Sequence, residues 1–170
     1  RLAERPWQFA LLILQILMFA AVRILLALRG TEGMQMEQML AITFDSLGIV
    51  VNIILFFGCM SILRQNRVIS LIMGLVLLAT TFLMLDAAFW TVNGVKLLRW
   101  LNIAVNTLDY CCGILLLLFY EAYLCAWLEI PAKERRVSML LQHLLALAGG
   151  ALILGNLAGG YLFTVTPDGV

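Results

Sequence analysis

Five long apolar stretches determine what this chain can fold into. They are Trp7–Leu28, Ile42–Leu63, Val68–Phe89, Leu98–Leu128 and Val137–Thr164. A helix needs about 20 apolar residues to cross a bilayer, because each residue advances it by about 1.5 Å. A strand of a membrane barrel would instead be about 10 residues of alternating pattern. The sequence therefore predicts an all-α polytopic membrane protein, a single domain built as a bundle of five transmembrane helices.

The composition excludes two other classes of protein. Of the 170 residues, 64% are apolar and 12% are charged. A soluble domain of this length has too little interior to hide so much apolar surface, and a disordered chain needs low hydrophobicity. The net charge of +1 gives no electrostatic attraction for nucleic acid. The expected partner is the lipid bilayer.

Lys and Arg in the loops predict the orientation, because cytoplasmic loops are enriched in both. The side that holds the N-terminus has seven of them: Arg1, Arg5, Arg64, Arg67, Lys133, Arg135 and Arg136. The other side has at most four: Arg29, Lys96, Arg99 and, if it reaches the interface, Arg23. We therefore expect a multi-pass protein of the cell (inner or plasma) membrane with its N-terminus in the cytoplasm.

Both ends of the chain suggest a fragment of a longer protein. It begins with Arg1, and it stops in a Pro-Asp-Gly turn at residues 167–169, a pattern that usually joins two elements. Five spans would leave the chain outside, so we expect a sixth helix and a cytoplasmic output domain after it.

The fourth stretch contains a polar stripe. Asn102, Asn106, Asp109, Gly113 and Tyr120 follow spacings of four, three, four and seven residues, which place them on one helix face. Lipid would not solvate such a face, so it must lie against other helices or a water-filled cavity.

Two further carboxylates lie near the same outer level, Asp45 in the second stretch and Asp86 in the third. Ionisable residues inside spans are costly and are functional candidates by default. One hypothesis is an outward-facing pocket for a cationic or hydrogen-bond-donating small molecule, lined by Asp45, Asp86, Asn102, Asn106 and Asp109. The alternative is that these side chains bond across the bundle and bind no ligand.

Two other titratable residues are interpreted as structural. Glu121 lies near the inner end of the fourth stretch, where Arg64, Arg67 or Arg135 would be its ion-pair partner. His143 is the one histidine, and we interpret it as bonded between helices, with a pH-sensing role as the less favoured alternative.

Small residues inside the stretches are interpreted as packing residues. Ala151, Gly155 and Gly159 follow a spacing of four, which lets another helix approach closely, either within the chain or in a homodimer. The cysteines, which have no metal-ligand spacing, are Cys59, Cys111, Cys112 and Cys125.

The sequence has no catalytic motif. It lacks a Gly-rich phosphate loop, a nucleophile beside a base and a pair of metal-binding histidines. We therefore expect no enzyme activity, cofactor or metal in this segment.

Residues 42–170 resemble the N-terminal membrane input region of certain bacterial signalling proteins, in which several helices precede a diguanylate cyclase (GGDEF) or histidine kinase domain. The matching pieces are Arg64–Arg67, Met84–Trp90 with Asn93-Gly94, Leu101–Tyr110, Phe119–Leu124, Asn156–Phe163 and Thr166–Gly169. The resemblance implies a sensor with one more helix leading to its output domain. The chain departs from that pattern in lacking an output domain, and the first stretch lies outside the similarity.

Three functions remain open at this point. A sensory input domain agrees with the outer polar residues and the short loops. A small transporter, or a substrate-binding transporter subunit, would use buried polar residues to bind its substrate. An assembly subunit would need no ligand at all.

Overall fold

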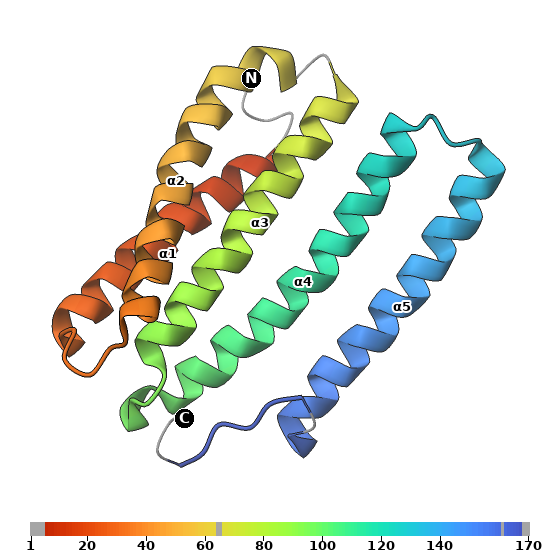
Figure 1. Ribbon diagram of the computed structural model, residues 1–170. Helices are drawn as coiled ribbons and strands as arrows, with labels where there is room; N and C mark the ends of the chain where they lie inside the picture. The colour runs from red at the N-terminus through yellow and green to blue at the C-terminus, as the bar shows by residue number, and fades with distance from the viewer. Residues whose placement is uncertain (1–5, 64–65, 161, 168–170) are drawn as a thin grey trace.

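The computed structural model describes residues 6–63, 66–160 and 162–167, and its helices run alternately up and down the molecule (Figure 1). They are α1 (Pro6–Arg29), α2 (Met36–Leu63), α3 (Arg67–Val92), α4 (Arg99–Trp127) and α5 (Ala132–Gly159), with a short 3-10 turn, η2 (Lys96–Leu98), before α4. All five α-helices are long and apolar enough to cross a membrane. No strand occurs in the described ranges, so the predicted all-α architecture is confirmed.

Two helices begin earlier than the sequence predicted. α2 begins at Met36 rather than at Ile42, because the backbone N–H of Gln35 donates to the Gln38 side chain at 3.0 Å and caps the first turn. α5 begins at Ala132, directly after Pro131, a residue that ends one element and favours the start of the next. The basic segment 133–136, which we expected to be a loop, is therefore helical.

α5 also ends five residues before the predicted Thr164. Gly160 takes a left-handed conformation with φ of 64° and closes the helix. The Asn156 side chain then accepts hydrogen bonds from the backbone N–H groups of Leu162 (2.5 Å) and Phe163 (3.3 Å). Phe163 stacks on Tyr110 with ring centroids 5.8 Å apart. The segment after α5 consequently returns to the side of α4.

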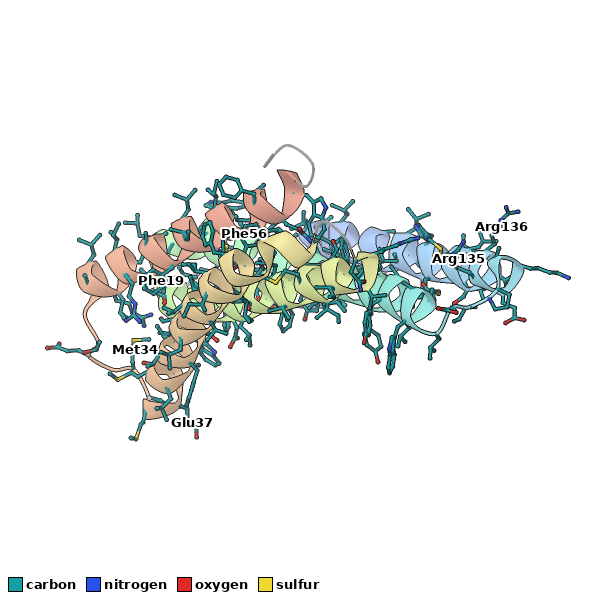
Figure 2. The ribbon with its side chains drawn as sticks, turned by 90° about the horizontal axis from the view of Figure 1, so that it is seen from above. Phe19, Met34, Glu37, Phe56, Arg135 and Arg136 are labelled. Carbon is teal, nitrogen blue, oxygen red and sulfur yellow. The ribbon has the colours of Figure 1, made fainter. Side chains whose placement is uncertain are left out.

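Charged residues gather at the two ends of the helices. Figure 2 shows Arg135 and Arg136 at one end and Glu37 at the other. We call the end where α1 and α3 begin the amino end, and the end where they finish the far end. Three of the predicted boundary cations, Arg1, Arg5 and Arg64, lie outside the described residues.

α1 and α3 run in the same direction and keep a constant register. Three side chains of α1 donate to backbone oxygens exactly 62 positions further along the chain: Gln8 to Ser70 (3.0 Å), Gln15 to Leu77 (2.6 Å) and Arg29 to Thr91 (2.7 Å). Val22 and Met84 continue the same register and are both buried in one apolar cluster. Contacts that recur every seven residues are typical of helices packed with a left-handed supercoil.

Gln15 also joins α1 to α2. Its Nε2 donates to Oγ1 of Thr81 at 3.0 Å, and its Oε1 accepts from Nδ2 of Asn52 at 3.2 Å. Gln15 is 0% exposed and Asn52 is 1% exposed. This amide therefore links three helices in the interior of the bundle.

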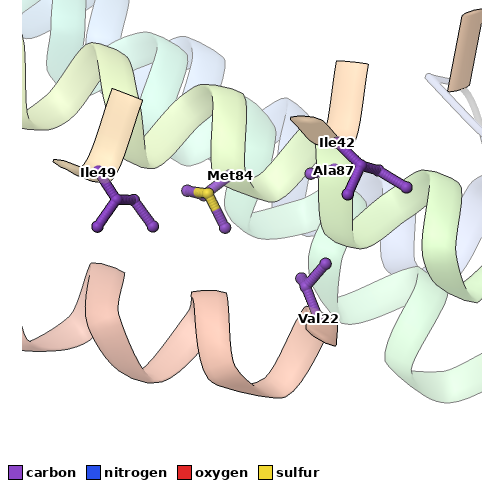
Figure 3. Packing of buried hydrophobic residues seen from close by; sticks show 5 residues of the cluster. All are labelled: Val22, Ile42, Ile49, Met84 and Ala87. Atoms are coloured by element: carbon purple, nitrogen blue, oxygen red, sulfur yellow. The ribbon is translucent and has the colours of Figure 1, made fainter. Parts of the chain in front are cut away.

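The apolar core surrounds α3, which is the most buried of the helices. One cluster joins α1, α2 and α3 through Val22, Ile42, Ile49, Met84 and Ala87 (Figure 3). At the amino end Gly74 allows a close approach, because a Cβ there would lie 2.6 Å from the Trp7 ring and 3.2 Å from the Phe119 ring. Gly74 thus lets α1 and α4 meet over α3.

α5 is the least buried helix and packs beside α4. It directs Gly149, Ile153 and Asn156 toward its neighbour: a Cβ at Gly149 would lie 3.0 Å from Ile114, and the other two are buried. The predicted small-residue row is exposed instead, at Ala151, Gly155 and Gly159. A Cβ at Gly155 would meet nothing within 4 Å in the described structure. The row is therefore not a packing face within the chain, and a homodimer seam stays a prediction.

We expect Gln15→Leu to lower the free energy of unfolding by about 1–2 kcal/mol, because three hydrogen bonds between helices are lost and each contributes about 0.6 kcal/mol on average. Reversible unfolding in mixed detergent micelles measures the change. Gln142→Leu on α5 is the matched control, and equal losses in the two variants would contradict the role of the Gln15 network.

Candidate functional site

Three consecutive helices, α2, α3 and α4, each carry one carboxylate whose charge acts on a neighbour across α3. Asp45 lies on α2, Asp86 on α3 and Asp109 on α4. Asp86 interacts electrostatically with both of the others. We call these three residues the carboxylate cluster. Asp86 therefore lies within electrostatic range of both Asp45 and Asp109, and it is the central residue of the three.

Two oxygens of the carboxylate cluster are buried without a hydrogen-bond partner among the described residues: Oδ2 of Asp45 and Oδ1 of Asp109. Asp45 is 5% exposed, whereas Asp109 is half-buried. Asp86 has a partner, because the Trp90 indole Nε1 donates to its Oδ2 at 3.2 Å. Buried polar atoms nearly always have a hydrogen-bond partner. These two oxygens are therefore the places in the bundle where a hydrogen-bond donor is missing.

The two predicted asparagines have a local role in the structure. Nδ2 of Asn106 donates to the backbone oxygen (2.9 Å) and to Oδ1 (2.7 Å) of Asn102, one turn earlier on α4. Nδ2 of Asn102 donates to Oδ1 of Asn93, the C-cap of α3, at 3.4 Å. This chain of amides ties the start of α4 to the end of α3.

A cavity of about 390 Å³ opens between α1, α3 and α4, and none of the five predicted residues lines it. Its walls are almost entirely apolar, and its one hydroxyl, that of Thr81, is already bonded to Gln15. On α3 and α4 the cavity lies beside the carboxylate cluster, because Leu85 and Leu108 line it while Asp86 and Asp109 follow them directly in sequence.

Two structural predictions need correction. The Glu121 carboxylate accepts a hydrogen bond from the Ser138 hydroxyl of α5, a partner in the second turn of that helix, rather than pairing with Arg67 or Arg135; Arg64 lies outside the described residues. His143 is exposed, and its Nδ1 lies 2.5 Å from the backbone oxygen of Met139 in the same helix. The histidine therefore does not bond between helices, because α5 turns that face away from α4.

Sequence inspection missed the amides that join α1 to its neighbours. Gln8, Gln15 and Asn52 are fully buried and hydrogen-bonded across helices. The available signal was the spacing of seven between Gln8 and Gln15 within an otherwise apolar stretch, which places both on one face.

The cysteines pack as small residues. Cys111, Cys112 and Cys125 are free thiols, and the Cys112 thiol lies 3.5 Å from the backbone oxygen of Leu78. The side chain of Cys59 lies outside the described part of the structure.

The carboxylate cluster offers negative charge and acceptor oxygens to a ligand. Within the described ranges, no group of three His, Cys, Asp or Glu residues could hold a metal ion. A small cation would thus need the helices to move closer together, whereas a larger cation that donates several hydrogen bonds would bridge the carboxylates at a greater separation.

Comparison with known proteins found no matching family model, no matching curated protein and no matching solved structure.

We expect Asp86→Asn to raise the free energy of unfolding by up to about 1 kcal/mol, because it removes the repulsion that Asp86 exerts on the buried Asp45 and the half-buried Asp109, part of which solvent screens. The amide oxygen still accepts the Trp90 indole hydrogen bond. Unfolding in mixed micelles measures the change, with Glu37→Gln at the exposed start of α2 as control. A loss of stability in Asp86→Asn alone would show that the charge itself stabilises the bundle.

Proposed function

We propose that this chain is a membrane-embedded sensory input domain, and that its cue is a cationic or hydrogen-bond-donating ligand bound at the carboxylate cluster. The observation that supports this proposal is the pair of buried, unpartnered oxygens of Asp45 and Asp109 beside Asp86. A buried oxygen without a hydrogen-bond partner destabilises the folded state, and a ligand that donates a hydrogen bond to it would remove that destabilisation.

Binding would change how three helices pack. The carboxylates lie on α2, α3 and α4, so a cation that neutralises their repulsion favours arrangements in which these helices lie closer together. A ligand shifts a conformational equilibrium by its difference in affinity for the two states. Without a ligand, the carboxylates repel one another and favour an arrangement in which the helices lie further apart. A cation would bind this arrangement less tightly than one in which the carboxylates lie closer together.

The signal would leave through the end of the chain that follows α5. In the proposed orientation the N-terminus is cytoplasmic, and a sixth helix returns to a cytoplasmic output domain of the cyclase or kinase type. The basic residues at the amino end, among them Arg67, Arg135 and Arg136, support that orientation. The resemblance of residues 42–170 to bacterial input regions stays a prediction, and it would imply the same arrangement.

One observation favours a transporter as the second candidate. Carboxylates inside spans without a salt-bridge partner are typical of proton and ion pathways. The protein reconstituted in vesicles would then dissipate a sodium or proton gradient across the vesicle membrane. Asp109→Asn would abolish this ion flux. A sensor would leave the gradient intact in both forms.

The intact mass of the natural protein in its own membrane tests the sensor proposal directly. A mass well above the 18.9 kDa of this chain is expected, since an output domain must be attached. A mass close to that value would overturn the sensor proposal and favour the transporter.

We expect spermidine, a cation with several N–H donors, to raise the thermal unfolding midpoint of the wild-type protein by at least about 2 °C at matched ionic strength. Asp109→Asn should fold but lose most of that rise, because it keeps the side-chain shape and removes one charge. Glu37→Gln is the control and should keep the full rise. An unchanged response in Asp109→Asn would remove the carboxylate cluster as the binding site.

A further inference from the structure

The apolar cavity between α1, α3 and α4 is a groove parallel to the helices. Each helix contributes lining residues over the same length of chain: Leu11 to Leu25 on α1, Leu78 to Val92 on α3 and Leu101 to Leu115 on α4. Fourteen residues of helix correspond to about 21 Å. The groove therefore extends along about two-thirds of a hydrocarbon core that is about 30 Å thick.

The lining of the groove suits a hydrocarbon chain. Its one hydroxyl, that of Thr81, accepts from the Gln15 amide and donates to the backbone oxygen of Leu77. Its two thiols, those of Cys111 and Cys112, are weak hydrogen-bonding groups that pack like small apolar side chains. The part of a ligand that lies in the groove must therefore be apolar.

The groove opens toward the surrounding lipid. Four leucines on its lining are 40–56% exposed: Leu14, Leu101, Leu108 and Leu115. Three of them recur every seven residues on α4 and form one long rim. An acyl chain would therefore enter sideways between α1 and α4 without crossing a polar barrier.

Positive charge lies at one end of the groove. Arg29 follows the lining residue Leu25 by four residues, on the same face of α1. Its Nη1 donates to the backbone oxygens of Trp90 (3.2 Å) and Thr91 (2.7 Å) at the end of α3. Among the described residues, its other guanidinium N–H groups make no hydrogen bond, and Lys96 and Arg99 lie at this same far end. A phosphate is the acceptor that a guanidinium matches best.

We propose that this groove binds one acyl chain of an anionic phospholipid, with the phosphate at Arg29 and the chain running along α1, α3 and α4 toward the amino end. The lipid completes the packing between α1 and α4, with or without a ligand at the carboxylate cluster. Both features of the groove, its apolar lining and its charged end, are needed for this assignment.

Native mass spectrometry of the purified protein with phosphatidylglycerol and with phosphatidylcholine tests the proposal. Ala21 lines the groove and Ala20 does not, although both are exposed on α1, so Ala21→Phe and Ala20→Phe form a matched pair. We expect Ala21→Phe to weaken retention of phosphatidylglycerol at least about tenfold, because displacing even two methylenes costs that much affinity. Ala20→Phe should bind as the wild type does.

Arg29→Gln tests the charged end. It should still retain a lipid but lose the preference for phosphatidylglycerol over phosphatidylcholine, whereas Arg23→Gln on the same helix should keep it. Should Ala21→Phe fail to fold by circular dichroism, Leu108→Trp fills the same groove from α4. Two results would overturn the proposal: equal retention of both lipids by the wild type, or full retention of phosphatidylglycerol by the groove-filling variant. Either would show that the lipid binds as an ordinary surface contact.

Discussion

The structure depends on the register in which α1 lies along α3. Gln8, Gln15 and Arg29 donate to α3 backbone oxygens, each 62 positions further on. In a bilayer, apolar side chains gain little by leaving lipid for protein, so close packing and hydrogen bonds between helices must fix which helix faces which. A slip of one residue would leave the Gln15 amide unpaired in an apolar interior. The register therefore places α1 along one side of α3, and α2 and α4 pack on two further sides.

The central position of α3 explains why the polar and apolar sites lie so close together. Its successive residues point in different directions, so Leu85 faces the groove beside α1 while Asp86 faces the carboxylates of α2 and α4. α4 repeats the arrangement with Leu108 and Asp109. α3 keeps one exposed face along Ile72, Ala79 and Leu83, and Asp86 continues that spacing. The carboxylate cluster therefore lies at the edge of the bundle, where Asp45 is buried and Asp86 and Asp109 are half-buried.

The sequence could predict the five helices because bilayer thickness sets a minimum length for each apolar stretch. It could not predict their ends at Met36 or Gly159, because these depend on a side-chain cap at Gln38 and a left-handed Gly160 rather than on hydropathy. The spacing of Asn102, Asn106 and Asp109 indicated one polar face, but it did not indicate that Tyr120, placed on the same face, would be 52% exposed. The partners of that face lie on other helices, and helical spacing within one chain segment contains no information about them. The same limit explains why Glu121 was assigned an arginine partner when its neighbour in space is Ser138.

The carboxylate cluster and the groove share two helices, and this sharing has a thermodynamic consequence for the two proposals. A cation that draws α4 toward α2 across α3 would change the width of the groove between α4 and α1. If the cation favours one arrangement of these helices and the lipid favours the same one, each must tighten the binding of the other by an equal factor. Because the groove lies between α1 and α4, a displacement of α4 would change how tightly it holds its occupant. The membrane lipid would then act as a second ligand of the proposed sensor, and the lipid composition would set the cation concentration at which it responds.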